Sequence, residues 1–172
     1  MEPFASLIRN IPDFPEPGVM FKDITPILAD REAFSELVSV MADPFRDDGV
    51  TQVAGIEARG FTLAAPIALE LGAGFIPIRK PGKLPFETKM EEYTLEYGTD
   101  QLEVHVDAAG GDDRVLLVDD VIATGGTAAA ALRLMESIGA KVVGFSVFIE
   151  LAFLNGKETL PEVPYHALLV YD

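Results

Sequence analysis

The chain contains 172 residues, of which 49% are hydrophobic and 24% are charged, and it has no cysteine. This composition predicts one globular domain, 1–172, with a full hydrophobic core, and it excludes disulfides and thiolate metal sites. The formal net charge of −15 argues against nonspecific binding to nucleic acid or to an anionic membrane. The N-terminus lacks a signal-peptide pattern and no credible membrane span is present, so we expect a cytoplasmic protein without a membrane partner.

The first 28 residues predict an arm that precedes the main sheet. Residues 2–10 predict a short helix, and 11–18, which hold three prolines, predict an ordered loop or arm. Residues 18–24 are apolar without a clean period. Asp30 then predicts the N-cap of a helix. The apolar positions of that helix follow helical spacing at Phe34, Leu37, Val38 and Met41.

The middle of the chain alternates predicted strands with a predicted helix. Residues 52–56 predict a strand, 61–71 a helix and 75–78 a second strand, with a glycine-containing turn at 57–60. Basic residues gather just after these strands, at Arg59, Arg79, Lys80 and Lys83. Isolated basic residues are usually solvated surface, but this placement at strand ends in an acidic chain favours a phosphate site.

A β-hairpin is predicted between residues 93 and 106. Segments 93–98 and 101–106 alternate around the turn at 98–100, whereas 84–92 is polar and has little pattern. The basic segment that leads into the hairpin favours a closing lid, and an inert surface hairpin is the alternative.

The most informative stretch is VLLVDDVIATGGTA, 115–128. Its first four residues predict a strand buried on both faces, and Asp119 and Asp120 follow where that strand should end. Small residues at 123–127 make a turn, and an alanine-rich helix follows to about Ser137. Glycines in such a turn let backbone N–H groups approach an anion at the N-terminus of a helix.

Two adjacent carboxylates would repel a phosphate, so Asp119 and Asp120 are expected to bind sugar hydroxyls, directly or through a divalent cation. The stretch therefore predicts a site for a phosphorylated sugar. A solvated strand end, a P-loop NTPase and a phospho-acceptor domain are the alternatives. The chain lacks the G-x-x-x-x-G-K-[ST] motif of the second, and the Thr-Gly-Gly-Thr turn argues against the third.

The remaining segments complete the predicted fold. Residues 141–149 predict a long strand, 151–160 a loop or short helix, and 165–171 a final strand. The alternation of strands and helices predicts an α/β fold with a mainly parallel, twisted sheet flanked by helices.

Six segments carry recognisable motifs: PGVMFKDITPIL (17–28), IEARGF (56–61), RKPGKLP (79–85), LEYG (95–98), VLLVDDVIATGGTA (115–128) and IEL…NGKE…LP…VPY (149–165). Together they resemble the type I phosphoribosyltransferases. The 115–128 motif specifies this wider family, whereas GVMFKDI and LEYG narrow the resemblance to its adenine-specific members. The resemblance implies the type I phosphoribosyltransferase fold, with a small N-terminal hood over the base in 1–28 and a basic lid with its hairpin in 79–106.

The resemblance implies a binding site for phosphoribosyl pyrophosphate (PRPP). Its residues would be Ala58, Arg59, Lys80, Lys83, Asp119, Asp120, Ala123, Thr124, Gly125, Gly126 and Thr127. The turn at 123–127 would bind the 5′-phosphate and the two aspartates the ribose. Pyrophosphate would lie on Ala58-Arg59, through a strained peptide, under Lys80, Lys83 and Tyr97. The implied catalytic residues are Glu96, which would handle the purine proton, with Arg59, Lys80, Lys83 and Tyr97.

The same resemblance implies a reaction, a cofactor and an assembly. Adenine would stack between Phe21 and Leu151, and main-chain groups around Met20 and Lys22 would read its edge. PRPP and adenine would give AMP and pyrophosphate, a step of purine salvage. Mg²⁺ would be held by PRPP and water near the two aspartates, without direct side-chain ligation, and the chain would form a homodimer.

Two alternatives stay open. The first is the same transfer to hypoxanthine, guanine, xanthine or orotate, which the N-terminal motif disfavours. The second is a regulatory protein that senses PRPP and binds DNA or RNA. Such a regulator would carry an extra domain or a basic face, and the net charge of −15 opposes the latter.

Overall fold

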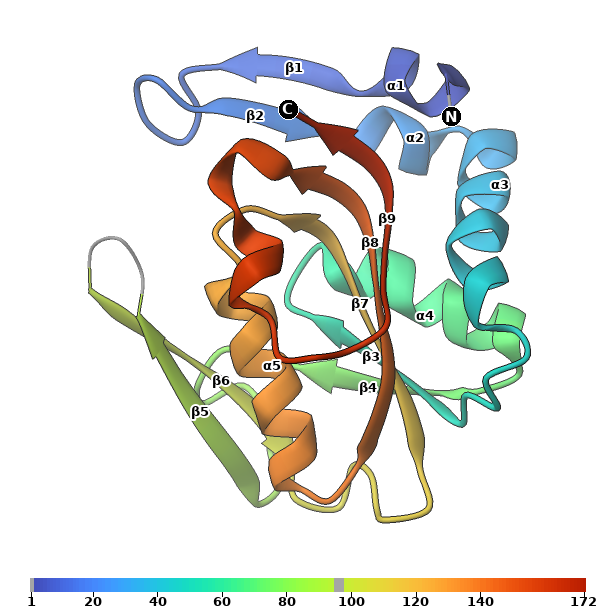
Figure 1. The fold of residues 1–172 in the computed structure, drawn as a ribbon, viewed down its shortest axis with the longest axis vertical. Helices are drawn as coiled ribbons and strands as arrows, with labels where there is room; N and C mark the ends of the chain where they lie inside the picture. Colours follow the sequence, from blue (N-terminus) through green and yellow to red (C-terminus); the bar gives the residue numbers. More distant parts are fainter. Residues whose placement is uncertain (1, 95–97) are drawn as a thin grey trace.

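A parallel sheet forms the centre of the fold. The computed structural model describes residues 2–94 and 98–172 (Figure 1). In this described part, the sheet has five strands: β3 (Gln52–Ile56), β4 (Gly74–Ile78), β7 (Arg114–Ile122), β8 (Lys141–Leu151) and β9 (Tyr165–Tyr171). They lie in the order β4-β3-β7-β8-β9, and the neighbouring strands are parallel. The order reverses between β3 and β7, which is where open α/β sheets bind ligands.

Helices cover both faces of the sheet (Figure 1). The main ones are α3 (Arg31–Ala42), α4 (Gly60–Leu71) and α5 (Gly126–Ser137). The alternation of side chains along β7 accounts for the two layers. Leu116 and Val118 enter the core that α3 and α4 cover, whereas Val115 and Leu117 enter the core that α5 covers. The predicted α/β fold with a parallel sheet and flanking helices is confirmed.

The N-terminal segment forms short elements: α1 (Glu2–Leu7), β1 (Arg9–Pro12), β2 (Met20–Asp23) and α2 (Thr25–Ala29). β1 and β2 make a two-stranded antiparallel ribbon, which Figure 1 shows beyond the carboxyl ends of the sheet strands. The helix predicted over 2–10 is present only as α1, which ends at Leu7. No strand was predicted in 11–18 or 18–24, but the first of these segments supplies the end of β1 and the second supplies β2. Pairing across the turn satisfies backbone groups that neither segment satisfies alone.

The predicted hairpin is present as β5 (Thr88–Thr94) and β6 (Thr99–His105), although Thr99 and Asp100, which were predicted in the turn, are the first residues of β6 and 95–97 lie outside the described residues. β5 begins inside the segment 84–92, where no pattern was predicted, because it pairs along its whole length with β6. β6 supplies the buried side chains Leu102 and Val104. The hairpin is joined to α5, since Arg133 Nε lies 2.7 Å from Glu91 Oε1.

β7 is longer than the sequence predicts. The strand was expected to end before Asp119, but it continues to Ile122. The added residues pair with β8, from Asp119 opposite Val147 to Ile122 opposite Glu150. On the other side, the pairing of β7 with β3 stops at Val118. The edge of β7 that faces β3 is therefore open from Asp119 onward.

Short 3₁₀ segments occupy 43–45 (η1), 152–154 (η2) and 156–159 (η3). The last two agree with the loop or short helix that was predicted over 151–160. The helix predicted after Asp30 is α3, and the Asp30 carboxylate accepts hydrogen bonds from the backbone N–H groups of Glu32 and Ala33. None of the helices in the described residues combines the length and the apolarity that a membrane crossing requires.

Candidate functional site

A cavity of about 260 Å³ opens where the strand order reverses. Three parts of the chain line it: the turn after β3 at 56–59, Lys80 after β4, and the end of β7 with the following turn and helix start at 119–128. These are the segments in which the sequence placed its PRPP site. The cavity exists because β3 ends at Ile56 while β7 continues along β8.

Asp119 and Asp120 are packed closely at this cavity. The backbone N–H of Asp120 donates to Asp119 Oδ1 at 2.9 Å, and Arg59 Nε lies 2.8 Å from Asp120 Oδ2. Burial and the Asp120 charge raise the pKa of Asp119 well above its usual range. Burial also raises the pKa of Asp120, although the Arg59 charge acts in the opposite direction. Gly60 makes the packing possible, because a Cβ there would lie 2.8 Å from Asp119 Oδ1.

The helix start beside the aspartates is suited to an anion. Gly125 is the N-cap of α5 with φ +82°, and α5 has no side-chain cap. The first N–H groups of a helix have no partner within it, and here they lie in the cavity lining. Thr124 is exposed and Thr127 is half-buried in the same lining. The segment 123–127 therefore has the free donors and the helix dipole that a phosphate requires.

A second loop supports this turn from behind. A Cβ on Gly125 would collide with the carbonyl oxygen of Gly156, and a Cβ on Gly156 would collide with the carbonyl oxygen of Ala123. Both glycines are therefore required by close backbone packing, and Gly125 is also required by its positive φ.

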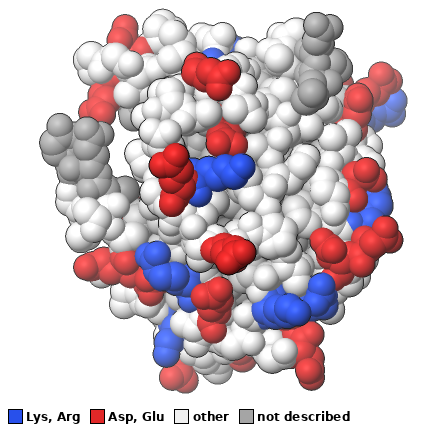
Figure 2. All heavy atoms as spheres, viewed as in Figure 1, with Lys and Arg blue, Asp and Glu red and all other residues white. Residues whose placement is uncertain are grey.

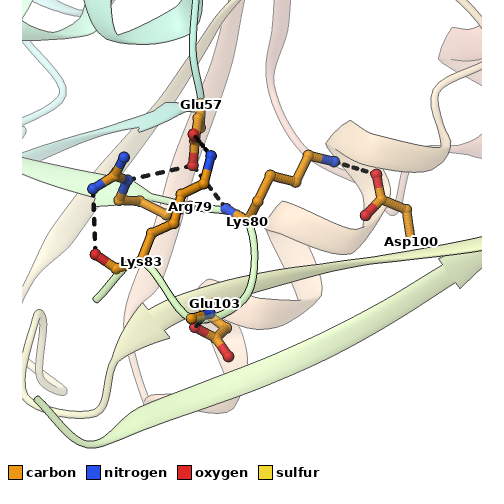
Figure 3. Close-up of polar contacts among 7 residues, drawn as sticks. Glu57, Arg79, Lys80, Lys83, Asp100 and Glu103 are labelled. Carbon is orange, nitrogen blue, oxygen red and sulfur yellow. Dashed lines mark hydrogen bonds and ion pairs between the residues drawn. The ribbon is translucent and has the colours of Figure 1, made fainter. Parts of the chain in front are cut away.

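Glu57 organises the basic segment after β4 (Figure 3). Its carboxylate accepts from the backbone N–H of Lys80 at 2.9 Å and lies 3.3 Å from Arg79 Nε. Lys83 Nζ forms an ion pair with the other oxygen of the same carboxylate. Burial alone would raise the pKa of Glu57, but these donors bring it below its usual range. The peptide between Glu57 and Ala58 is cis.

The side chain of Lys80 points away from Glu57 and toward the hairpin (Figure 3). Its ammonium group forms an ion pair with Asp100 and donates to Tyr93 Oη at 2.8 Å. Burial alone would lower the pKa of Lys80, but the contacts with Asp100 and Tyr93 raise it. Lys80 is thus a link between the cavity and the first residues of β6.

The cations of the site are paired with carboxylates. Figure 2 shows the same relation on one face of the molecule, where blue atoms adjoin red ones. The pairs at the site are Arg59 with Asp120, Lys80 with Asp100, and both Arg79 and Lys83 with Glu57. The chain does concentrate cations at the predicted place, but it neutralises them there.

A smaller cavity, of about 90 Å³, adjoins the first. Its lining consists of Val19, Met20, Phe21, Lys22, Arg59, Val121 and Leu151. Arg59 and Val121 line both cavities. The Arg59 guanidinium carbon lies 4.7 Å from the centre of the Phe21 ring. The Lys22 ammonium donates to Asn10 Oδ1 at 2.8 Å, so the side chain of Lys22 is engaged outside this lining.

Most of the predicted site residues are brought together. All predicted PRPP-site residues except Lys83 line the larger cavity, and Lys83 is held beside it by Glu57. The four predicted base-site residues line the smaller cavity. Glu96 and Tyr97 lie outside the described residues.

Further residues at the site were not predicted as site residues, among them Glu57, Tyr93, Asp100 and Val121. Glu57 and Asp100 carried one signal, since each is an acidic residue close to a site motif in the sequence. Val121 lies inside the motif 115–128, although no role was assigned to it, whereas Tyr93 carried no signal beyond its place in a predicted strand.

We expect the two supporting glycines to differ from a glycine that has only a positive φ. Gly125→Ala combines a backbone collision with φ +82°, and Gly156→Ala has the collision alone. Gly139→Ala has φ +87° with no atom within 4 Å of the new Cβ. Gly139→Ala should lower the free energy of unfolding by about 1–2 kcal/mol, and the other two by more. Urea denaturation measures all three, and equal losses would contradict the close packing.

Asp119→Asn is expected to stabilise the ligand-free chain at neutral pH. Because the pKa of Asp119 is raised on folding, its contribution to stability is present at acidic pH and is lost as the pH rises through the folded-state pKa. At pH 7 the substitution should raise Tm by about 2–4 °C, equivalent to about 1 kcal/mol, and the gain should shrink in acid.

Asp113→Asn is the matched control, for which we expect a change in Tm of the opposite sign. Hydrogen bonds from the Gly110 N–H and the Thr51 hydroxyl lower the pKa of Asp113. Its stabilising effect is present at neutral pH and is lost as the pH falls through the folded-state pKa, so the substitution should lower Tm at pH 7. A lower Tm for both variants would show that Asp119 is not a destabilising buried charge.

Comparison with known proteins adds independent information. The phosphoribosyl transferase domain family model matches residues 27–166. Adenine phosphoribosyltransferase of Anaeromyxobacter dehalogenans is 52% identical over 171 residues, which cover 99% of each chain. The crystal structure of the Rhodothermus marinus adenine phosphoribosyltransferase has a TM-score of 0.95 and 51% identity, covering 99% of this chain and 97% of that one.

A more distant structure carries ligands. Adenine phosphoribosyltransferase of Saccharomyces cerevisiae, complexed with an imino-altritol bisphosphate and adenine, has a TM-score of 0.92 and 36% identity, covering 98% of this chain and 97% of that one. The matched sequence, the matched fold and the cavity at the strand reversal agree with one another. The chain belongs to the adenine phosphoribosyltransferases, within the phosphoribosyl transferase domain family.

Proposed function

We propose that this chain transfers the phosphoribosyl group of PRPP to adenine, giving AMP and pyrophosphate in purine salvage. The observation that carries the proposal is that the two cavities share Arg59 and Val121. A phosphate-binding helix start, a carboxylate pair and an apolar pocket thus follow one another in the order of phosphate, ribose and base in AMP. Family membership supports the same reaction.

The larger cavity is the proposed PRPP site. The 5′-phosphate is bound by backbone N–H groups of 123–127 and the hydroxyls of Thr124 and Thr127. The ribose hydroxyls are bound by the aspartate pair, in which Asp120 Oδ2 is buried, lies beside Arg59 and accepts no hydrogen bond from the described residues. Pyrophosphate is bound by Ala58-Arg59 and by the two lysines of the segment 79–83.

The smaller cavity is the proposed adenine site. Adenine stacks between Phe21 and Leu151, and main-chain groups around Met20 and Lys22 bind its edge. The contact of the Lys22 ammonium with Asn10 supports a main-chain role for Lys22. A purine that enters this space replaces the Arg59 guanidinium on the Phe21 ring, which leaves that cation for pyrophosphate.

The reaction separates charge, and residues of the chain stabilise both the positive and the negative charge that develop. Positive charge grows on the ribose near the aspartate pair, and negative charge grows on pyrophosphate near Arg59, Lys80 and Lys83. Holding adenine against the opposite face of the ribose supplies orientation, which is worth up to about 7–11 kcal/mol in intramolecular reactions. Glu96 is the proposed acceptor of the purine proton, and Tyr97 is proposed to close over pyrophosphate.

Mg²⁺ is the proposed cofactor. Two adjacent carboxylates with raised pKa values, open to the cavity, suit a hydrated divalent cation, because a nearby positive charge favours their ionised forms. When bound with PRPP, Mg²⁺ neutralises charge on the leaving pyrophosphate.

We further propose how the chain is organised. It acts as one domain, 1–172, in which 1–28 form the arm and hood over the base and 79–106 form the lid. The contacts of Lys80 with Asp100 and Tyr93 join the basic segment to the hairpin, so that both can move together over pyrophosphate. A chain without cysteine suits a reducing compartment, and the proposed location is the cytoplasm.

A homodimer is the proposed assembly. An apolar hollow of about 490 Å³ lies between α3 and α4, lined by Leu28, Phe34, Phe61, Thr62, Ala65, Pro66 and Leu69. Leu69 is 83% exposed at its edge, and a second copy would cover it. Light scattering after gel filtration should give the mass of two chains, and Leu69→Glu should lower it; a single-chain mass for the unaltered protein would contradict this proposal.

A product assay tests the proposed reaction directly. The protein is incubated with PRPP and Mg²⁺ and, in separate reactions, with adenine, hypoxanthine, guanine, xanthine or orotate. AMP and pyrophosphate should form with adenine alone, because the apolar pocket and its main-chain groups were assigned to that base. Product from a different base would retain the PRPP site and overturn the assigned base. PRPP binding without product from any base would indicate a regulator that senses PRPP.

A further inference from the structure

The 3₁₀ turn η3 (Gly156–Thr159) lies directly against the turn assigned to the 5′-phosphate. Thr159 contributes hydrogen bonds to this contact as well as packing. Its hydroxyl lies 2.8 Å from the carbonyl oxygen of Gly156 and 3.3 Å from the carbonyl oxygen of Thr124. The first bond closes the turn η3 itself, whereas the second joins η3 to the turn before α5.

A hydroxyl group carries a single proton, and here both carbonyl oxygens accept it in a three-centre bond. The bond to Thr124 determines how the next peptide faces. The peptide between Thr124 and Gly125 is trans, so its C=O and N–H groups point in opposite directions. With the carbonyl bound to Thr159, the Gly125 N–H is turned away from η3.

Glycine makes this orientation easy to lose. A peptide that precedes glycine can rotate, because glycine adopts positive and negative φ with similar ease. Thr124 and Gly125 both line the larger cavity, and no side chain caps the N-terminus of α5. A rotated peptide would present a carbonyl oxygen where a phosphate needs a donor.

We propose that Thr159 is a positioning residue for the 5′-phosphate. Its hydroxyl holds the Thr124 carbonyl away from the phosphate and so fixes the Gly125 N–H as a donor. This inference rests on the proposed function, because it takes the turn at 123–127 to be the site of the 5′-phosphate. It adds to that function a residue that follows β8 and lies outside the cavity lining.

The test compares Thr159→Val, which keeps the shape and removes the hydroxyl, with Thr159→Ser, which keeps the hydroxyl. Ribose 5-phosphate is the probe, since it carries the 5′-phosphate without base or pyrophosphate, and titration calorimetry gives its Kd. Thr159→Val should raise this Kd and the KM for PRPP by about 3- to 10-fold, the effect of one hydrogen bond. The KM for adenine and kcat should stay within about 2-fold, and Thr159→Ser should stay close to the unaltered protein.

Thr51→Val is the matched control. The Thr51 hydroxyl bridges Asp113 and the Arg114 N–H at the opposite end of β3 and β7. Its loss should leave the Kd for ribose 5-phosphate unchanged. If Thr51→Val weakened binding as much as Thr159→Val, the effect would be general destabilisation and the inference would be wrong.

Two results would overturn the positioning role: an unchanged Kd for ribose 5-phosphate in Thr159→Val, or equal impairment of the Ser and Val variants. Failure of the proposed function gives a different result. If the unaltered protein made no AMP but Thr159→Val still weakened ribose 5-phosphate binding selectively, the positioning role would be upheld for another phosphosugar reaction.

Discussion

Two neighbouring carboxyl groups at the end of β7, where β3 no longer continues, are the constraint on which the site depends. Burial raises the pKa of both, and Arg59 forms an ion pair with Asp120. Such a pair is costly while no ligand is present, since charge is held close to like charge in a buried place. On the proposed function, the same oxygens bind ribose hydroxyls and a hydrated Mg²⁺, so the group that lowers stability is the one that binds the sugar.

The acidity of the chain is compatible with a highly anionic substrate because the site exchanges one anion for another. The cations around the larger cavity have carboxylate partners that the fold supplies, at Asp120, Asp100 and Glu57. These partners hold the basic side chains near the cavity without leaving a cluster of mutually repelling cations. Pyrophosphate would replace some of these carboxylates, and Mg²⁺ would reduce the repulsion that remains.

Local sequence patterns predicted the elements whose structure depends on residues that are close together in the sequence. The strand at 52–56 matches β3, and the helix expected after Asp30 is α3 with the expected N-cap. The extent of β7 could not be predicted, because residues 119–122 are strand only through pairing with β8. Partners such as Asp100 for Lys80 and Gly156 for Gly125 were also missed, since they lie 20 and 31 residues apart and meet only in the fold. Sequence motifs showed which residues belong to the site, and tertiary packing determines how they are held.

The most direct test of the account is a crystal structure of the protein with AMP. We predict the phosphate on the backbone N–H groups of 123–127, the ribose hydroxyls on Asp119 and Asp120, and the adenine ring between Phe21 and Leu151. The Arg59 guanidinium should have left the Phe21 ring. AMP bound with its phosphate away from α5, or with its base outside the smaller cavity, would contradict the account.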